Sequence, residues 1–461
     1  MQFLKKLFAP VDMTMGKPWE KILIFAVPLL IGNIAQQLYN TVDSIVVGRY
    51  VGDNALAAVG SAGPIINLLI VLFVGISTGA TIKVSQYMGA RDREGLSGTI
   101  SNSLVLTVIA SLIITVLGLI LSRPMLVMLD TPESILDWCT SYLHIAFLGC
   151  IGSAFYNILG GILRGLGDSV SSLMFLLIAC VLNIFLDIWF VAGFDMGVAG
   201  VALATAIAQA ISAILCAVKL LSMKELFDIR PELMRLKKKY AGSIIRLGLP
   251  SGVTQAIFST SMILVQALTN SFGELMIAAN VIVMRIDGFA MMPNFSFGTA
   301  LTTYAGQNVG AGRLDRVKEG AKQGTFMALG VSTAITLVLI FFGKYLMMIF
   351  TDTPELIERA AKMLRILAVG YIAMAVLQSL AGVMRGAGDT VRPMWVSIVQ
   401  TIGIRMPLAY LLCYLTRSEL NPTGRWEMLP LSLVIAWLCG ATATAIFYKR
   451  GKWREMANLS K

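Results

Sequence analysis

The stretch ILRGLGDSV (residues 162–170) returns in the second half of the chain as VMRGAGDTV (residues 383–391). The same separation relates SQYMGARDRE (residues 85–94) to GQNVGAGRLD (residues 306–315). A separation of 222 residues, one more, relates Pro28 to Pro250 and Pro132 to Pro354. Several motifs in the same order at a nearly constant separation are the signature of an internal repeat. The sequence therefore predicts two halves of similar design.

Each RGxGD motif lies at a short break between two apolar stretches. Glycine readily ends a helix, and the following Asp, Ser or Thr readily caps the next one. A phosphate-binding loop would need a preceding strand and a Lys-Ser/Thr pair, which neither motif has. We therefore expect two helix-to-helix turns. Because the sequence shows no nucleotide-binding loop, we expect any active process of this protein to draw its energy from an ion gradient.

The composition is that of an integral membrane protein. Of 461 residues, 57% are hydrophobic and 14% are charged, with a mean hydropathy of +0.77, far more apolar than soluble proteins. Apolar stretches long enough to cross about 30 Å of hydrocarbon recur along the chain. We expect about twelve spanning helices, at residues 22–47, 56–80, 100–121, 135–161, 171–192, 198–221, 244–270, 275–300, 325–343, 363–384, 394–415 and 428–447.

The net charge of +11 indicates membrane orientation rather than nucleic-acid binding. Basic residues gather before the first expected span, after the last one and in alternate loops, including the run at residues 235–239. Such an alternation follows the positive-inside rule. We expect a multi-pass protein of the plasma (bacterial inner) membrane with both termini in the cytoplasm and no nucleic-acid partner.

An even number of spans in each half gives both halves the same orientation, as in the parallel repeats of some secondary transporters. We predict an all-α fold with two pseudo-symmetric six-helix lobes. The amino-terminal lobe (residues 1–222) holds spans 1–6, residues 223–240 form a basic cytoplasmic linker, and the carboxy-terminal lobe (residues 241–461) holds spans 7–12. This architecture favours transport, although a duplication can also build only a scaffold.

Polar side chains of the first half share one depth in the expected membrane. Counting about 1.5 Å per residue along each span places four of them near the outer third: Asp43, Asn183, Asp187 and Thr205. Any one alone is readily satisfied within its own helix, but two carboxylates at one depth favour a shared site. Repulsion and burial would let that site hold a proton, and the same oxygens suit a small hard cation. Two further polar residues lie deeper, Gln36 and Asn157.

The second half carries a different set. Arg285 and Asp287 lie near the middle of span 8, and Arg405 lies near the middle of span 11. A buried arginine needs a partner, so we expect Asp287 to contact Arg405 or Arg285. Structural bracing and a substrate role both remain open for this set. Span 8 contains three methionines, Met284, Met291 and Met292. Their flexible, polarizable side chains suit a cavity for apolar organic cations and equally suit ordinary helix packing.

Taken in order, the motifs resemble those of the multidrug and toxic compound extrusion (MATE) family over nearly the whole chain. The matching segments are PLLIGNIAQQLYNTVDSIVVG in span 1, the MGARD loop, ILRGLGD after span 4, NIFLDIWF in span 5 and GVAGVALAT in span 6. The resemblance implies a cation-coupled antiporter that exports organic, often cationic, compounds by alternating access. It implies no enzyme and no cofactor beyond a coupling ion, H⁺ or Na⁺.

In the DinF-like branch of that family, the ion site uses an aspartate in span 1, an asparagine and an aspartate in span 5 and a threonine in span 6. These positions match Asp43, Asn183, Asp187 and Thr205, where sodium is one candidate ion. The NorM-like branch instead uses acidic residues in spans 7 and 10, which this sequence lacks. The expected substrate cavity draws on both lobes: Gln36, Tyr39, Asn157, Met284, Asp287, Met291 and Met292.

Two other classes compete with the antiporter. A lipid-linked precursor flippase of a related fold would need a strongly basic cavity, and only Arg285 and Arg405 support one. A channel would conduct ions without exchange. We expect a monomer whose partners are small organic cations or amphiphiles and the membrane lipid.

Overall fold

The computed structural model is built from helices, and it describes residues 10–128, 131–229, 232, 234–419 and 422–459. Among these residues, ten helices are long and apolar enough to cross a membrane, or eleven if the bent pair α5 and α6 forms one span. The expected all-α membrane fold is confirmed. The helix expected as the seventh span is α9 (Lys238–Asn270), which is 33 residues long.

The chain divides into two compact units. Unit 1 comprises Val27–Gly252 with residues 10–12, and unit 2 comprises Val253–Lys461 with Met13–Ala26. Two helices therefore contribute to both units: α2 (Pro18–Tyr50) and α9. The remaining helices of each unit start at a nearly constant separation from their counterparts as far as the second RGxGD motif, as the repeat predicts.

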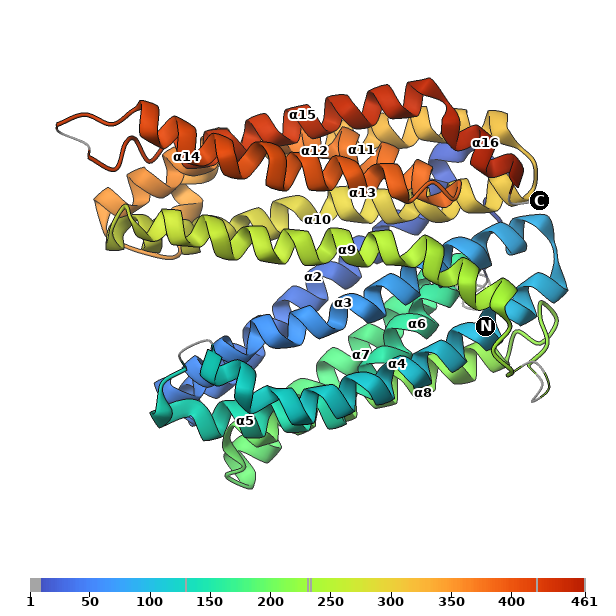
Figure 1. Ribbon diagram of the computed structural model, residues 1–461, viewed down its shortest axis with the longest axis horizontal. Helices are drawn as coiled ribbons and strands as arrows, with labels where there is room; N and C mark the ends of the chain where they lie inside the picture. The colour runs from blue at the N-terminus through green and yellow to red at the C-terminus, as the bar shows by residue number, and fades with distance from the viewer. Residues whose placement is uncertain (1–9, 129–130, 230–231, 233, 420–421, 460–461) are drawn as a thin grey trace. The chain divides into compact units, whose positions relative to one another are not determined.

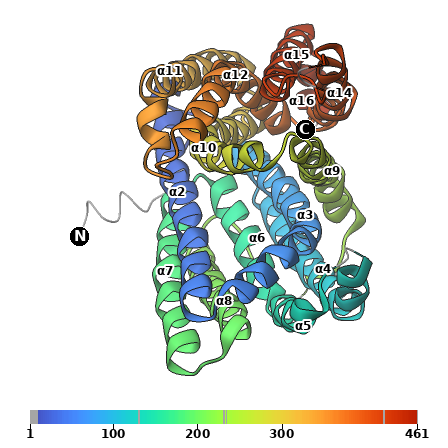
Figure 2. The ribbon, with the colours of Figure 1, turned by 90° about the vertical axis from the view of Figure 1, so that its left-hand side faces the viewer.

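In unit 1, α6 (Cys150–Leu166) lies at the centre of the bundle (Figure 2). Its partners are the other long helices: α3 (Asp53–Ala90), α4 (Arg93–Met128), α5 (Glu133–Leu148), α7 (Ser169–Ile188) and α8 (Gly197–Leu221). The helices α3 and α6 approach closely because Ser77 and Thr81 donate hydrogen bonds to the backbone carbonyls of Asn157 and Gly161, at 2.8 and 2.9 Å. Such small polar contacts hold helices together where lipid provides little hydrophobic driving force.

In unit 2, α12 (Pro354–Gly386) takes the central place and packs against α10 (Glu274–Gly310), α11 (Leu314–Met347) and α15 (Met428–Arg450). The helices α10, α12 and α15 run roughly parallel in Figure 1. The span after the second RGxGD turn is broken into three pieces by a π-helical stretch: α13 (Val391–Ile398), η3 (Val399–Arg405) and α14 (Met406–Leu415). A short α16 (Lys452–Leu459) follows α15, and a shorter π-helical stretch, η1 (Trp189–Gly193), ends α7 of unit 1.

Both RGxGD motifs form the predicted turns. Gly167 ends α6 with a φ of 96°, a left-handed conformation that glycine adopts without strain. Asp168 then caps α7 by accepting a hydrogen bond from the Ser171 amide at 2.9 Å. In the second copy, Gly388 has a φ of 95°, and Asp389 accepts from the Arg392 amide at 3.4 Å.

The close approach of α10 and α12 generates the first prediction. A Cβ atom added to Gly382 would lie 2.3 Å from the Gly298 carbonyl oxygen, a backbone atom that cannot rotate away. We expect Gly382→Ala to lower the free energy of unfolding by about 1–3 kcal/mol, as overpacking typically does. Thermal unfolding in detergent checks this. The matched control is Gly330→Ala, since nothing lies within 4 Å of a Cβ at Gly330; equal effects of both changes would contradict the packing.

Candidate functional site

Unit 1 brings together the four polar residues that the sequence places at one depth. Asp43 comes from α2, Asn183 and Asp187 come from successive turns of α7, and Thr205 comes from α8. With its amide oriented to satisfy its neighbours, the Asn183 nitrogen lies 2.8 Å from Asp43 Oδ1 and 3.3 Å from Asp187 Oδ2. The amide oxygen of Asn183 then accepts from the Thr205 backbone N–H at 3.2 Å.

Two tyrosines complete this carboxylate cluster. Tyr39 lies one turn before Asp43 on α2, and its hydroxyl lies close to Asp43 and Thr205. Tyr142, on α5, lies close to both Asp43 and Asp187. The side chains of Asn183 and Asp187 are buried, as is Tyr39. The cluster therefore combines carboxylate, amide and hydroxyl oxygens in a space largely shielded from solvent.

The carboxylate cluster has no balancing positive charge among the described residues. Asp43 and Asp187 are in hydrogen-bond contact with each other, and no Lys, Arg or His forms an ion pair with either. The Asp187 Oδ1 atom is buried and lacks a hydrogen-bond partner in the described structure. Two ionised carboxylates in contact repel each other strongly, so one of them must take up a proton or both must share a cation.

The oxygens of the carboxylate cluster fit a hard cation better than a transition metal. In the described part of the chain, no group of three or more His, Cys, Asp or Glu side chains is placed to hold a metal ion. Sodium, in contrast, is suited by carboxylate, amide and hydroxyl oxygens, which is the donor set present here. This donor set admits a proton or a small hard cation, of which sodium is one.

Two other expected residues of unit 1 lie outside the cluster's hydrogen bonds. The side chain of Gln36 is exposed. The Asn157 amide donates to the Ser153 carbonyl in its own helix at 2.8 Å. The structure therefore places the polar group of the first half in two environments, a compact cluster and a more open face.

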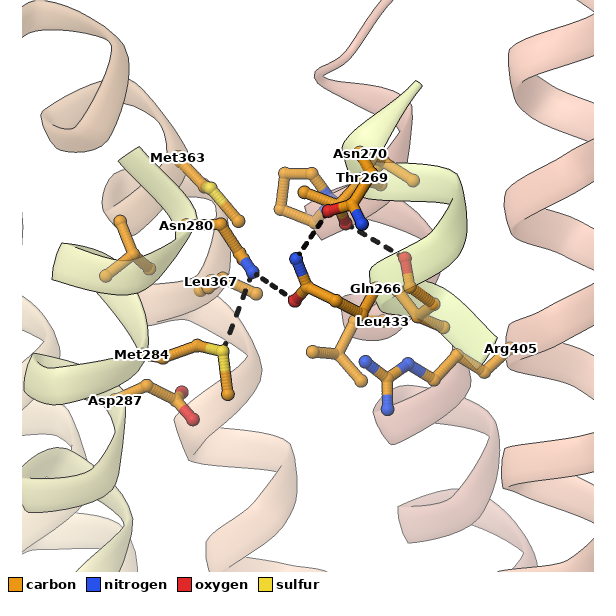
Figure 3. A pocket seen from close by; sticks show the side chains of 14 residues that line it. Gln266, Thr269, Asn270, Asn280, Met284, Asp287, Met363, Leu367, Arg405 and Leu433 are labelled. Carbon is orange, nitrogen blue, oxygen red and sulfur yellow. Dashed lines mark hydrogen bonds between the residues drawn. The ribbon is translucent and has the colours of Figure 1, made fainter. Parts of the chain in front are cut away.

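Unit 2 contains a cavity of about 520 Å³ with a mixed lining (Figure 3). Its polar wall carries a chain of amides, in which Gln266 donates to Asn270 at 2.8 Å and Asn280 donates to Gln266 at 3.3 Å. The other lining residues are apolar or single polar groups from α9, α10, α12 and α15: Val265, Thr269, Val283, Met284, Met363, Leu367, Leu429, Pro430 and Leu433. A cavity of this volume and lining suits a drug-sized amphipathic molecule.

Asp287 and Arg405 face this cavity from opposite sides (Figure 3). The expected contact of Asp287 with Arg405 or Arg285 is not an ion pair among the described residues. Instead, the Tyr371 hydroxyl donates to Asp287 at 2.9 Å, and Arg405 donates to the Ser261 hydroxyl at 3.3 Å. Tyr371 and Ser261 thus supply the polar partners that the two charges need, while Arg285 is exposed and does not line the cavity.

The expected methionines of span 8 divide between two environments. Met284 lines the cavity of unit 2. Met291 and Met292 are buried and are not among the residues that line it. Met291 packs in the hydrophobic core around Tyr371 and Leu367, which is the ordinary packing that the sequence left open.

The sequence did not predict that Tyr142 lies beside the carboxylates, nor that amides line a cavity in unit 2. The repeat, however, indicates where that cavity lies. At a separation of 222 residues, which also relates the Pro28 and Pro250 of the two halves, Val265 is the counterpart of Asp43, and Arg405 is the counterpart of Asn183. Both Val265 and Arg405 line the cavity. Two of the four repeat positions of the carboxylate cluster therefore lie at the cavity, with an apolar side chain in place of Asp43 and a basic one in place of Asn183.

Comparison with known proteins places these features in a family. The MatE family model matches residues 28–189 and again residues 250–411, once for each half of the repeat. Over 445 residues, the chain is 27% identical to the "Probable multidrug resistance protein YpnP" of Bacillus subtilis, covering 96% of this chain and 98% of that protein. It is 24% identical over 446 residues to the "Probable multidrug resistance protein NorM" of Thermotoga maritima, covering 96% and 94%.

A solved structure shares the fold. It is the outward-facing conformation of a multidrug resistance MATE family transporter of the MOP superfamily, with a TM-score of 0.89 and 23% identity. The match covers 97% of this chain and 99% of that chain. At this identity the likeness establishes the fold alone.

The unbalanced carboxyl pair generates the second prediction. A bound cation relieves the repulsion between the two carboxyl groups. We therefore expect sodium at about 100 times its dissociation constant to stabilise the protein by about 2.7 kcal/mol. If the ion is a proton, the same hundredfold excess of protons is expected to have the same effect. Asp187→Asn removes one charge and is expected to abolish this dependence. Thermal unfolding across sodium and pH series measures it. Asp137→Asn is the control, since Asp137 is 82% exposed and pairs with Arg123; the same loss in both variants, or none in either, would contradict the account.

Proposed function

The chain belongs to the MatE family, and on that premise we propose that it is a cation-coupled secondary antiporter that exports organic, often cationic, compounds. The observation that carries the proposal is the contact between Asp43 and Asp187 in unit 1, which has no balancing cation among the described residues. A site that needs one proton or cation binds and releases it as conditions change. That property is what coupling to an ion gradient requires.

We assign the coupling ion, H⁺ or Na⁺, to Asp43, Asn183, Asp187 and Thr205. Asn183 donates toward both carboxyl groups, so it keeps them together whether the ion is bound or absent. The Tyr39 hydroxyl lies close to Asp43 and to Thr205 on the neighbouring helix, so a change at the carboxylates reaches both α2 and α8. An ion shifts a transporter between conformations only through different affinities for the two states. Movement of α2 relative to α7 and α8 would change the number of oxygens around the ion, and hence its affinity.

Substrate recognition is assigned to the cavity of unit 2, with Asp287 and Met284 as its main contacts. The carboxyl group of Asp287 attracts a cationic group, and the polarizable Met284 sulfur and aliphatic walls accept varied apolar surfaces. The wider set proposed for the substrate path also includes residues outside this cavity: Gln36, Tyr39, Asn157, Met291 and Met292. The names of the two relatives as multidrug resistance proteins support an organic, small-molecule substrate.

The proposal includes alternating access as the transport mechanism and a monomer as the working form. It places the protein in the plasma (bacterial inner) membrane with both termini in the cytoplasm, on the strength of the basic residues in alternate loops. For a monovalent organic cation exchanged against one proton, no net charge crosses the membrane. The voltage term of about 2.3 kcal/mol per charge per 100 mV then cancels, and export follows the pH gradient.

A lipid-linked precursor flippase is the alternative, because Arg405 faces the cavity of unit 2 and is suited to an anionic headgroup. Arg285 gives it no support, since its side chain is exposed outside the cavity. The two functions differ in what the ion gradient does. An antiporter concentrates a soluble cation against its gradient, whereas a flippase moves a lipid between leaflets.

The third prediction tests the proposed coupling in liposomes that contain a fluorescent organic cation and carry an imposed pH or sodium gradient. We expect one of the two gradients to drive transport by the wild type. Asp43→Asn and Asp187→Asn are each expected to reduce gradient-driven transport by about 5- to 150-fold. These factors correspond to the coupling free energies of about 1–3 kcal/mol that are typical between two binding sites. The measurement is the initial rate of dye movement.

Substrate counterflow without any ion gradient is the control for these variants. Counterflow exchanges labelled for unlabelled substrate and needs an intact substrate site but no energy from the ion. Variants that retain counterflow yet lose gradient-driven transport establish the carboxyl pair as the coupling site. Full gradient-driven transport in both variants would refute the assignment, and gradient-independent dye flux in the wild type would refute antiport.

A further inference from the structure

A second charged feature of unit 1 lies where α3 and α9 cross. The backbones touch there: a Cβ atom on Gly79 would lie 2.1 Å from the Ile244 carbonyl oxygen, and one on Gly248 would lie 2.0 Å from that of Gly75. Glycines spaced four apart let helices approach this closely in membranes. The crossing therefore fixes which side chains of α3 meet the first turns of α9.

Lys83 is the next residue on this face of α3, one turn beyond Gly79. It is half-buried, and its ammonium group lies 5.4 Å from the centre of the Tyr87 ring. Because Gly75 meets Gly248 and Gly79 meets Ile244, Lys83 comes opposite the start of α9, whose first three turns carry Lys239 and Arg246. Lys83, Lys239 and Arg246 form what we call the basic cluster.

No acidic side chain balances the basic cluster among the described residues. None of its three members takes part in an ion pair there, and the charges that act on Lys83 are both positive. Asp92, the acidic residue at the end of α3, accepts a hydrogen bond from the Gly95 amide at 2.9 Å and so caps α4. The sequence itself has no Asp or Glu from residue 233 to residue 273. Three neighbouring cations of this kind favour an anion from outside the chain.

The surface beside the basic cluster is apolar. Ile245 and Leu249, on successive turns of α9, are 45% and 57% exposed. Arg246 is next to Ile245 in the sequence and one turn before Leu249, so the three side chains adjoin on the helix surface. A ligand that fits both features carries a negative charge at one end and a hydrocarbon chain at the other.

We propose that the basic cluster binds the headgroup of an anionic phospholipid, with an acyl chain lying along Ile245 and Leu249. The lipid phosphate neutralises the repulsion among the three cations and holds the start of α9 against α3. A soluble phosphate would meet the charge but leave the exposed apolar side chains uncovered. The site shares no residue with the carboxylate cluster or with the cavity of unit 2, so it stands apart from the proposed antiport.

The test uses the full-length protein in detergent, with phosphatidylglycerol and phosphatidylcholine of the same acyl chains as probes. Native mass spectrometry counts bound lipids, and thermal unfolding reports their stabilising effect. Basic residues near a membrane each contribute about fivefold in affinity for anionic lipid. We expect Lys83→Gln alone to weaken one phosphatidylglycerol site about fivefold, and Lys83→Gln/Lys239→Gln/Arg246→Gln to weaken it about a hundredfold.

The control carries the same charge change elsewhere: Lys449→Gln/Arg450→Gln/Lys452→Gln, at the end of α15 and the start of α16, is expected to leave that site intact. In phosphatidylcholine the cluster variants should be at least as stable as the wild type, because they remove repulsion. Equal binding of both lipids, or equal losses in cluster and control variants, would overturn the proposal. Stabilisation by inorganic phosphate that depends on Lys83, without any by phosphatidylglycerol, would identify a soluble anion and overturn it as well.

Discussion

Two carboxyl groups in contact within a bundle of membrane-spanning helices cannot both be ionised without a counter-charge. Asp43 and Asp187 are in this position in unit 1, and Asn183 donates toward both of them. No Lys, Arg or His among the described residues forms an ion pair with either carboxyl group, so the arrangement suits one exchangeable proton or cation. The proposed activity depends on this constraint.

The repeat explains why the two units carry sites of different chemistry. Both units have the same order of helices around a central one, α6 in unit 1 and α12 in unit 2. At a separation of 222 residues, which is that of the two family matches, unit 2 has Arg405 in place of Asn183 and Val265 in place of Asp43. A permanent cation and an apolar side chain are unsuited to an exchangeable proton. They line a cavity whose volume and amides suit an organic molecule. The two proposed sites thus lie on similar scaffolds and differ in a few side chains.

Much of the fold was predictable from the sequence because its causes are local. Apolar stretches of spanning length, basic residues in alternate loops and the two RGxGD motifs define helices and turns. Gly167 and Asp168 form the turn that their chemistry favours. Depth along a helix is also local, since it follows from counting residues, and it brought Asp43, Asn183, Asp187 and Thr205 into one group. The structure places these four together.

Which way a side chain faces was less predictable, because that depends on how helices rotate and cross. In a membrane, both the lipid-facing and the packed sides of a helix are apolar, so periodicity gives little guidance. Gln36 is exposed and Met291 is buried, although the sequence assigned both to one expected cavity. Arg405 and Asp287 each found a neutral hydroxyl partner, Ser261 and Tyr371, on a helix distant in sequence. The two opposite charges face each other across the cavity without forming an ion pair among the described residues.

The central claim is that the carboxyl pair of unit 1 holds one exchangeable proton or cation. Infrared difference spectroscopy of the purified protein measures this directly, since a protonated carboxyl group absorbs apart from a carboxylate. The account predicts a buried protonated carboxyl at neutral pH that disappears on alkaline titration or on sodium addition, and that is absent from the Asp43→Asn/Asp187→Asn protein. Two ionised carboxylates in the wild type at neutral pH, with no cation bound at equilibrium, would contradict it.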